Sequence, residues 1–192
     1  MTGSTAALRL SLISVVLLML TSGCAIMSKS DCLQGHWAEA GNHDALRGYT
    51  SSARLHSRMK VCQKHGVSAN KVDYLLGYKE GLEHYCQPER ALSAGVNNHT
   101  YRGICPVEME KPFLEQYISG LSIARRDIWF RYQWLEDELF DARIHRRRDD
   151  QKRHQYVEER IARLSNRLDD LRARQFDINR KIALWSQRLQ EI

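Results

Sequence analysis

The hydrophobic and polar positions divide this chain of 192 residues into three parts. The first part is an apolar run from Leu10 to Leu20, with Arg9 before it and small residues between it and Cys24. A run of about 11 residues is short for a transmembrane helix, which needs about 20, and the order of charge, apolar run and small residues is typical of an export signal. The pattern therefore predicts a signal peptide over residues 1–23.

The last part of the chain has the periodicity of long helices. After Pro112 the only helix-breaking residue is Gly120, and apolar residues recur in steps of three and four. A first run comprises Leu114, Ile118, Leu121, Ile128, Tyr132, Leu135, Leu139 and Ala142. A second run, the C-terminal seam, comprises Val157, Ile161, Leu164, Leu168, Leu171, Ile178, Ile182, Trp185, Leu189 and Ile192, with the polar Gln175 at one position. A sustained heptad pattern of this kind predicts a coiled-coil region over residues 121–192.

The two runs are out of phase by one residue, and the polar segment from Ile144 to His154 separates them. Two alternatives follow, a helical hairpin or one long helix that absorbs the discontinuity. The absence of glycine and proline from the segment favours the continuous or kinked helix. We expect the C-terminal seam to bind a protein partner or a second copy of the chain, because an exposed apolar seam is unfavourable in water. Four aromatic residues lie off the first run, and we expect them to pack against the middle of the chain: Trp129, Phe130, Trp134 and Phe140.

The middle part, residues 32–120, is rich in glycine and cysteine and has shorter helical stretches. One stretch spans Leu46–Met59, and another spans Val67–Leu82 with Ser68 as its expected N-cap. Gly77 and Gly81 fall on one face of the second stretch. Because glycine is unfavourable inside a helix, this pair indicates close packing against another backbone.

Four cysteines follow Cys24, namely Cys32, Cys62, Cys86 and Cys105. An even number in a small exported domain predicts two disulfides. None forms a Cys-x-x-Cys pair, which argues against a zinc site. Three pairings are open, of which we favour Cys32–Cys62 and Cys86–Cys105, because the second pair brackets a glycine-bearing loop.

The segment Leu20-Thr21-Ser22-Gly23-Cys24 resembles the lipobox of bacterial lipoproteins, with Thr21 where leucine is more common. The resemblance implies that Cys24 becomes the acylated first residue, followed by a polar tether to residue 31. The residue after it is Ala25, not the aspartate that often marks inner-membrane retention, so the implied location is the periplasmic face of the outer membrane. The alternative is an ordinary secretory signal with a chance cysteine.

Residues 32–120 also carry a pattern of Gly, Tyr and Cys positions. It includes Cys32, Trp37, Gly41, Asp44, Gly48, Cys62, Tyr74-x-x-Gly77-x-x-x-Gly81-Leu82, Tyr85-Cys86-x-Pro88, Gly95, Tyr101-x-Gly103-x-Cys105-Pro106 and Gly120. This pattern resembles the proteobacterial lipoproteins grouped as domain-of-unknown-function family 2799. Ala45, Ala91 and Asn98 stand where that family commonly has glycine. The resemblance implies a lipid-anchored envelope protein and supplies no activity.

Charge and chemistry add little to this picture. The net charge of +6 permits contact with anionic lipids or glycans and does not by itself indicate nucleic-acid binding. The basic residues Arg146, Arg147, Arg148, Lys152 and Arg153 are expected to form a solvated face, with contact to envelope phosphates as the alternative. No catalytic, cofactor-binding or metal-binding motif is present in the sequence. We therefore expect a mainly α-helical, non-catalytic scaffold or interaction protein, the alternative being a binding module for envelope glycans or lipids.

Overall fold

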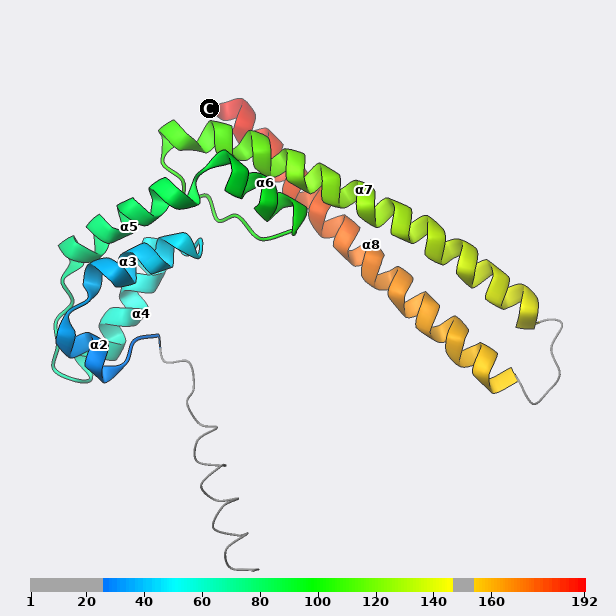
Figure 1. Cartoon of the computed structure of the whole chain (residues 1–192), viewed down its shortest axis with the longest axis horizontal. Coiled ribbons are helices and arrows are strands. Elements are labelled where there is room, and N and C mark those ends of the chain that lie inside the picture. The colour runs from blue at the N-terminus through cyan, green and yellow to red at the C-terminus, as the bar shows by residue number, and fades with distance from the viewer. Residues whose placement is uncertain (1–25, 147–153) are drawn as a thin grey trace, which may run out of the picture.

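The computed structural model describes residues 26–146 and 154–192, and the regular structure there is helical. The helices are α2 (Lys29–Gln34), α3 (Trp37–Leu46), α4 (Ser51–Gln63), α5 (Lys71–Tyr85), α6 (Pro88–Val96), α7 (Val107–Arg146) and α8 (His154–Glu191). Helices α2 to α5 form one end of the molecule, and α7 and α8 lie side by side in a long arm that extends away from it (Figure 1). A small disulfide-stapled helical domain followed by a long helical region is therefore confirmed.

Helices α3 and α5 cross with their backbones in contact. A β-carbon added to Gly77 of α5 would overlap the carbonyl oxygen of Ala38, and one added to Gly41 of α3 would overlap that of Tyr74. A β-carbon at Gly81 would likewise meet the Asn42 carbonyl. The close packing expected of Gly77 and Gly81 is therefore present, and Gly41 supplies its other side.

Helices α6 and α7 repeat this crossing. A β-carbon at Gly95 of α6 would overlap the Tyr117 carbonyl oxygen, and one at Gly120 of α7 would overlap that of Leu92. The molecule thus contains two pairs of helices that touch through glycine, α3 with α5 (the first helix pair) and α6 with α7 (the second helix pair).

The two helix pairs correspond residue by residue. Cys32 and Gly41 each have a counterpart 54 positions later, in Cys86 and Gly95. Cys62, Tyr74 and Gly77 each have one 43 positions later, in Cys105, Tyr117 and Gly120. The second offset is smaller because the first pair holds α4 between its two helices, where the second pair has only the connection between α6 and α7. Residues 32–120 therefore contain an internal repeat of one disulfide-bearing unit.

A different third helix covers each pair. In the first pair, Arg58 of α4 binds Asp44, which follows the α3 crossing. In the second pair, Lys181 of α8 binds Asn98, the residue 54 positions after Asp44, with Nζ 2.8 Å from Oδ1. The C-terminal helix α8 thus contacts the second pair at the position that corresponds to the contact of α4 with the first pair.

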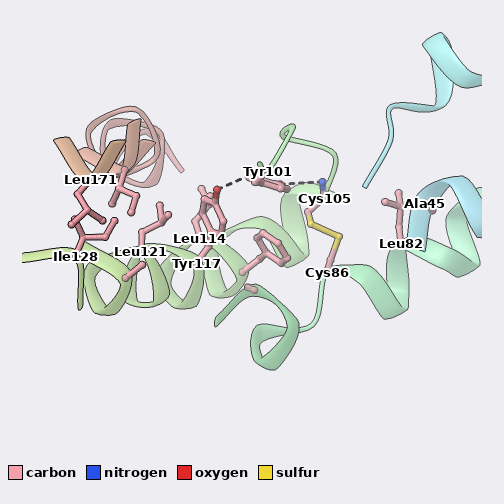
Figure 2. Close-up of a cluster of buried hydrophobic side chains, with 14 of the residues drawn as sticks. Ala45, Leu82, Cys86, Tyr101, Cys105, Leu114, Tyr117, Leu121, Ile128 and Leu171 are labelled. Atoms are coloured by element: carbon pink, nitrogen blue, oxygen red, sulfur yellow. Dashed lines mark hydrogen bonds between the residues drawn. A yellow bond between two sulfur atoms is a disulfide. The ribbon is translucent and has the colours of Figure 1, made fainter. Parts of the chain in front are cut away.

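Helices α7 and α8 form a hairpin, so the continuous helix favoured from the sequence is wrong and the alternative is correct. The connection between them, residues 147–153, lies outside the described residues. A single straight helix would leave the C-terminal seam in water, whereas folding back buries it. Val157, Leu164, Leu168, Leu171 and Ile178 are buried, and Ile161, Ile182, Trp185, Leu189 and Ile192 are partly buried against the same core. The seam expected to face a partner is therefore occupied within the chain, as the packing of Leu171 near Ile128 illustrates (Figure 2).

Helix boundaries differ from the expected ones at three places. The Leu46–Met59 stretch is interrupted between α3 and α4, where Gly48 has a φ of 70°. Helix α5 is capped by Asn70, whose side chain accepts hydrogen bonds from two backbone amides, and not by Ser68. Helix α7 begins at Val107, so it passes through the expected domain boundary at residue 120 and joins the cysteine-rich domain to the arm. No helix within the described ranges is long and apolar enough to cross a bilayer.

Candidate functional site

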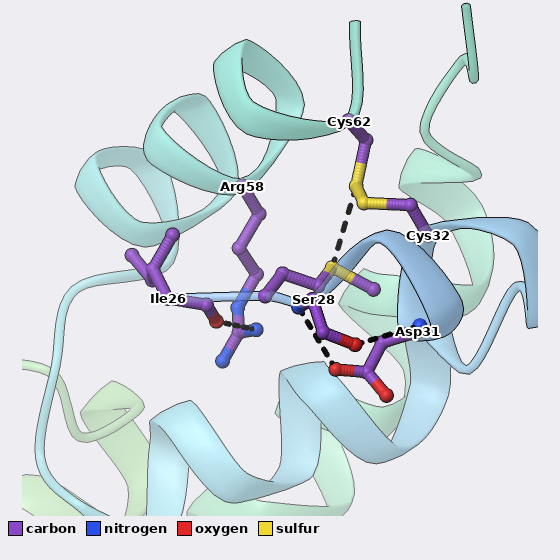
Figure 3. Close-up of a disulfide and its surroundings, with 7 residues drawn as sticks. Ile26, Ser28, Asp31, Cys32, Arg58 and Cys62 are labelled. Atoms are coloured by element: carbon purple, nitrogen blue, oxygen red, sulfur yellow. Dashed lines mark hydrogen bonds between the residues drawn. A yellow bond between two sulfur atoms is a disulfide. The ribbon is translucent and has the colours of Figure 1, made fainter. Parts of the chain in front are cut away.

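The chain docks onto the domain within two residues of Cys24, which itself lies outside the described residues. The carbonyl oxygen of Ile26 accepts a hydrogen bond from Nη1 of Arg58 at 2.7 Å. Met27 is buried, with its sulfur 3.6 Å from Sγ of Cys62 (Figure 3). Helix α2 then starts at Lys29, where Ser28 and Asp31 form a capping box. The tether expected up to residue 31 is therefore short, because two residues span at most about 7 Å.

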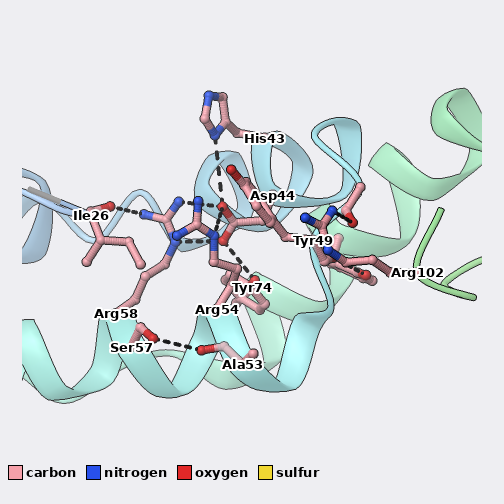
Figure 4. A network of polar contacts seen from close by, with 12 residues as sticks. Ile26, His43, Asp44, Tyr49, Ala53, Arg54, Ser57, Arg58, Tyr74 and Arg102 are labelled. Atoms are coloured by element: carbon pink, nitrogen blue, oxygen red, sulfur yellow. Dashed lines mark hydrogen bonds and ion pairs between the residues drawn. The ribbon is translucent and has the colours of Figure 1, made fainter. Parts of the chain in front are cut away.

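Arg58 connects this docked segment to the core of the first helix pair. Its Nε and Nη2 donate to the two oxygens of Asp44 at 2.7 and 2.8 Å, and the Tyr74 hydroxyl donates to the same carboxylate at 2.9 Å (Figure 4). Asp44 is completely buried. The hydrogen bonds to Asp44 raise the pKa of Arg58 above its usual value, and burial raises the pKa of Tyr74. Through Arg58 the network connects the buried carboxylate of α3 to the backbone at Ile26.

The disulfides join Cys32 to Cys62 and Cys86 to Cys105, which is the pairing that the sequence favoured. The first connects α2 to α4, and the second connects the end of α5 to the segment before α7. They occupy equivalent positions in the two copies of the repeated unit. Among the described residues, no three His, Cys, Asp or Glu side chains are grouped so that they could hold a metal ion.

A cleft of about 670 Å³ opens where the two helix pairs meet. We call it the inter-pair cleft, and its lining consists of Leu46, Arg47, Tyr49, Tyr85, Arg90, Ser93, Ala94, His99, Thr100, Arg102 and Phe113. The end of α3 and the turn after it supply the first three residues, and α6 and the connection to α7 supply most of the others. Its volume is in the range of small-molecule binding sites.

Backbone carbonyls of the turn hold two of the cleft's three guanidinium groups. Nη2 of Arg90 donates to the Leu46 carbonyl at 2.7 Å, and Nη1 of Arg102 donates to the Gly48 carbonyl at 2.9 Å. Arg47 lies between these two carbonyls in the sequence. The three cations are therefore gathered around a single turn.

Two tyrosine rings support the same guanidinium groups. Arg90 lies 5.7 Å from the centre of the Tyr85 ring, and Arg102 lies 5.2 Å from that of Tyr49. Burial raises the pKa of Tyr85, while the charges of Arg102 and Arg90 oppose that rise. The Tyr85 ring also packs against Gly48, where a β-carbon would lie 2.7 Å from the hydroxyl oxygen. Glycine is therefore required at residue 48 both for its positive φ and for this contact.

No aspartate or glutamate lines the inter-pair cleft, and none of its arginines forms an ion pair with a described residue. The arm differs, since Arg131 pairs with Asp127 there and Arg160 pairs with Glu138. Sequence reasoning missed this site because its cations come from three separate segments. No local motif marks them, and only the packing of the two helix pairs brings them together.

The aromatic residues of α7 lie on the surface, contrary to expectation. Trp129, Phe130, Trp134 and Phe140 are 49–64% exposed, and we call them the aromatic face. The cysteine-rich domain contacts α7 around Gly120, nearer the beginning of the helix. Farther along, α8 covers the side of α7 that carries Ile128, Leu135 and Leu139, which are buried. The aromatic face stays largely exposed, and two of its members, Trp134 and Phe140, line grooves beside α8.

Residues 36–122 match the model of a family described as a protein of unknown function, DUF2799. The matched segment contains both glycine crossings, the Cys86–Cys105 disulfide and the whole lining of the inter-pair cleft. The resemblance to this family is therefore confirmed over that segment. Neither the curated proteins nor the solved structures provide a match to this chain.

Proposed function

We propose that this chain is a lipid-anchored protein of the Gram-negative envelope, on the periplasmic face of the outer membrane, that acts by contact and not by catalysis. The observation that carries the proposal is the aromatic face of α7. Four large aromatic side chains stay exposed on an arm whose own apolar seam is buried. Exposed apolar patches rich in Trp and Phe are typical of protein interaction surfaces.

The docked N-terminus supports the anchoring part of the proposal. Acyl chains on Cys24 would hold the first helix pair close to the bilayer, because the backbone is fixed again at Ile26. Helix α7 has 40 residues, which corresponds to a length of about 60 Å. An anchor at one end and a long rigid arm at the other suit a protein that presents a surface to a partner.

The partner surface proposed here differs from the one that the sequence suggested. The C-terminal seam is packed against α7, whereas the aromatic face is largely exposed in the described structure. The proposed occupant is another envelope protein with a complementary apolar surface. Self-association through this face is the alternative outcome of the test.

Two measurements test the two parts separately. Metabolic labelling with palmitate should mark the wild-type chain, and Cys24→Ser should abolish both the label and membrane association. In-cell crosslinking followed by affinity purification should give a defined complex that is lost in the Phe130→Ser, Trp134→Ser double variant. Phe176→Ser is the matched control, because Phe176 is 72% exposed but lies on α8. A complex that survives the double variant would refute the role of the aromatic face, and light scattering would identify a homodimer.

A second candidate function, a binding module for an envelope glycan or lipid, is favoured by the inter-pair cleft. Its three arginines, which form no ion pair with a described residue, and its aromatic walls suit a small anionic ligand.

A further inference from the structure

We infer that the inter-pair cleft binds a phosphate group, carried by a phosphorylated sugar or by a phospholipid headgroup. The site is separate from the aromatic face. It does not depend on acylation of Cys24, so its test and those of the proposed function can fail independently.

The first argument is the uncompensated charge of the cleft. Arg47, Arg90 and Arg102 bring three positive charges to one turn, and no described residue of the lining is an aspartate or glutamate. Arg90 and Arg102 are each held by a single backbone carbonyl through one nitrogen. A guanidinium has five N–H donors, so most of the donors of both groups remain available to a ligand.

The second argument concerns which anion fits. Guanidinium groups bind both carboxylates and phosphates in a two-pronged geometry. A carboxylate carries one charge, whereas a phosphate monoester carries about −1.5 to −2 at pH 7 and three acceptor oxygens. Three cations with the hydroxyl groups of Ser93 and Thr100 nearby match the phosphate better.

The third argument is the mixed character of the walls. Tyr49, Tyr85 and Phe113 supply aromatic surface, and Leu46 and Ala94 supply aliphatic surface. The Tyr85 hydroxyl forms no hydrogen bond with a described residue. The positive charges of Arg102 and Arg90 are close enough to lower its pKa against the effect of burial. These groups give the body of the ligand, a sugar ring or the glycerol part of a lipid, a surface beside its phosphate.

Calorimetry on the full chain, purified in a neutral maltoside detergent, tests the inference with three probes. Glucose 6-phosphate represents the sugar source, phosphatidic acid in mixed micelles represents the lipid source, and glucose is the uncharged control. We expect binding of at least one phosphate probe, no binding of glucose, and weaker binding as salt is raised. Binding of glucose 6-phosphate alone would assign the sugar source, and binding of phosphatidic acid alone would assign the lipid source.

Variants connect the binding to the cleft. Arg47→Gln is the cleanest variant, because this side chain makes no hydrogen bond or ion pair with a described residue, so its loss should leave thermal unfolding unchanged. We expect it to weaken phosphate binding about tenfold, as does the loss of one charge-assisted hydrogen bond. Arg102→Gln should weaken binding at least as much, and Arg102→Lys should restore part of it.

Arg163→Gln is the matched control, since Arg163 is an exposed arginine of the arm that pairs with Glu159. It should bind the phosphate probes as the wild type does. The inference is overturned when the wild type binds neither phosphate probe at millimolar concentration. It is equally overturned when Arg47→Gln and Arg163→Gln bind with the same affinity.

Discussion

The two helix pairs share one crossing and one disulfide position but differ in the helix that covers them. The first pair is covered by α4, which lies between its own two helices in the sequence. The second pair lacks that insertion and is covered by α8, which follows after the whole of α7. The comparison teaches that this unit needs a third helix, and that the helix can come from nearby or from the far end of the chain.

The polar contacts of the two covers also differ. Arg58 forms a buried, two-pronged ion pair with Asp44, assisted by Tyr74. In the second pair the cation is Lys181, and the residue that corresponds to Asp44 is the neutral Asn98. The counter-charge is Asp177 on α8 itself, whose pKa is lowered to about 2, chiefly by its hydrogen bond to Lys181. We therefore expect the stability of the first pair to depend on the charge of Asp44, whose counterpart in the second pair is the neutral Asn98.

The largest effect should come from breaking the glycine crossings. Gly77→Val and Gly120→Val each place side-chain atoms where a neighbouring backbone carbonyl lies, so the helices must separate. We expect each to lower the free energy of unfolding by about 4 kcal/mol or more, measured by denaturant titration. Gly66→Ala is the control, because that glycine has a positive φ but open space around it, and about 1 kcal/mol is expected there. Effects as small as the control would contradict backbone contact.

The next largest effect should separate the two covers. Asp44→Ala leaves the buried guanidinium of Arg58 without its partner, and we expect a loss of about 3–4 kcal/mol. Asn98→Ala removes a neutral partner from Lys181, which is as buried as Arg58 but keeps its ion pair with Asp177, and we expect about 1 kcal/mol. Thermal and denaturant unfolding of both variants measure the difference. Equal losses would show that the two contacts are equivalent despite their different charge.

The disulfides should contribute almost equally. The Cys32–Cys62 bridge closes a separation of 30 residues and the Cys86–Cys105 bridge one of 19. The chain-entropy relation then gives about 3.6 and 3.2 kcal/mol. Replacing each pair by serine and comparing denaturation midpoints tests this expectation. A difference above about 1 kcal/mol would mean that one bridge does more than restrict the unfolded chain.

The smallest effect concerns alkaline pH. Burial raises the pKa of Tyr78 in the first pair and of Tyr117 in the second to about 12. Since tyrosine in the unfolded chain ionises near pH 10, the stability from each neutral phenol is complete below about pH 10 and is lost as pH rises toward 12. At pH 11 we expect a loss of about 1 kcal/mol per tyrosine relative to pH 9.

Phenylalanine variants serve as the control for this pH effect. Tyr78→Phe and Tyr117→Phe remove hydrogen bonds to the carbonyls of Tyr49 and His99, so each lowers stability at neutral pH. The double variant should nevertheless lose less stability between pH 9 and 11 than the wild type. A wild-type stability that is flat over this range would contradict the raised pKa values.

The sequence by itself determined the helical class, the presence of two disulfides and the glycine face of α5, and it favoured the disulfide pairing that the structure shows. These follow from local periodicity, from cysteine number and from the unfavourable placement of glycine inside a helix. The lipidation of Cys24 and the envelope location remain predictions from the leader.

Only the tertiary structure decided where the apolar surfaces go and which charges meet. The sequence pattern of the C-terminal seam is the same whether the seam binds a partner or packs against α7. Periodicity shows that one face of a helix will be buried, but it does not show which surface will cover that face. The aromatic face was expected in the core for the same reason. No sequence motif connects Arg47, Arg90 and Arg102. They come close together only because the two helix pairs pack at one turn. Local pattern fixes the elements, while burial over the whole chain selects their neighbours.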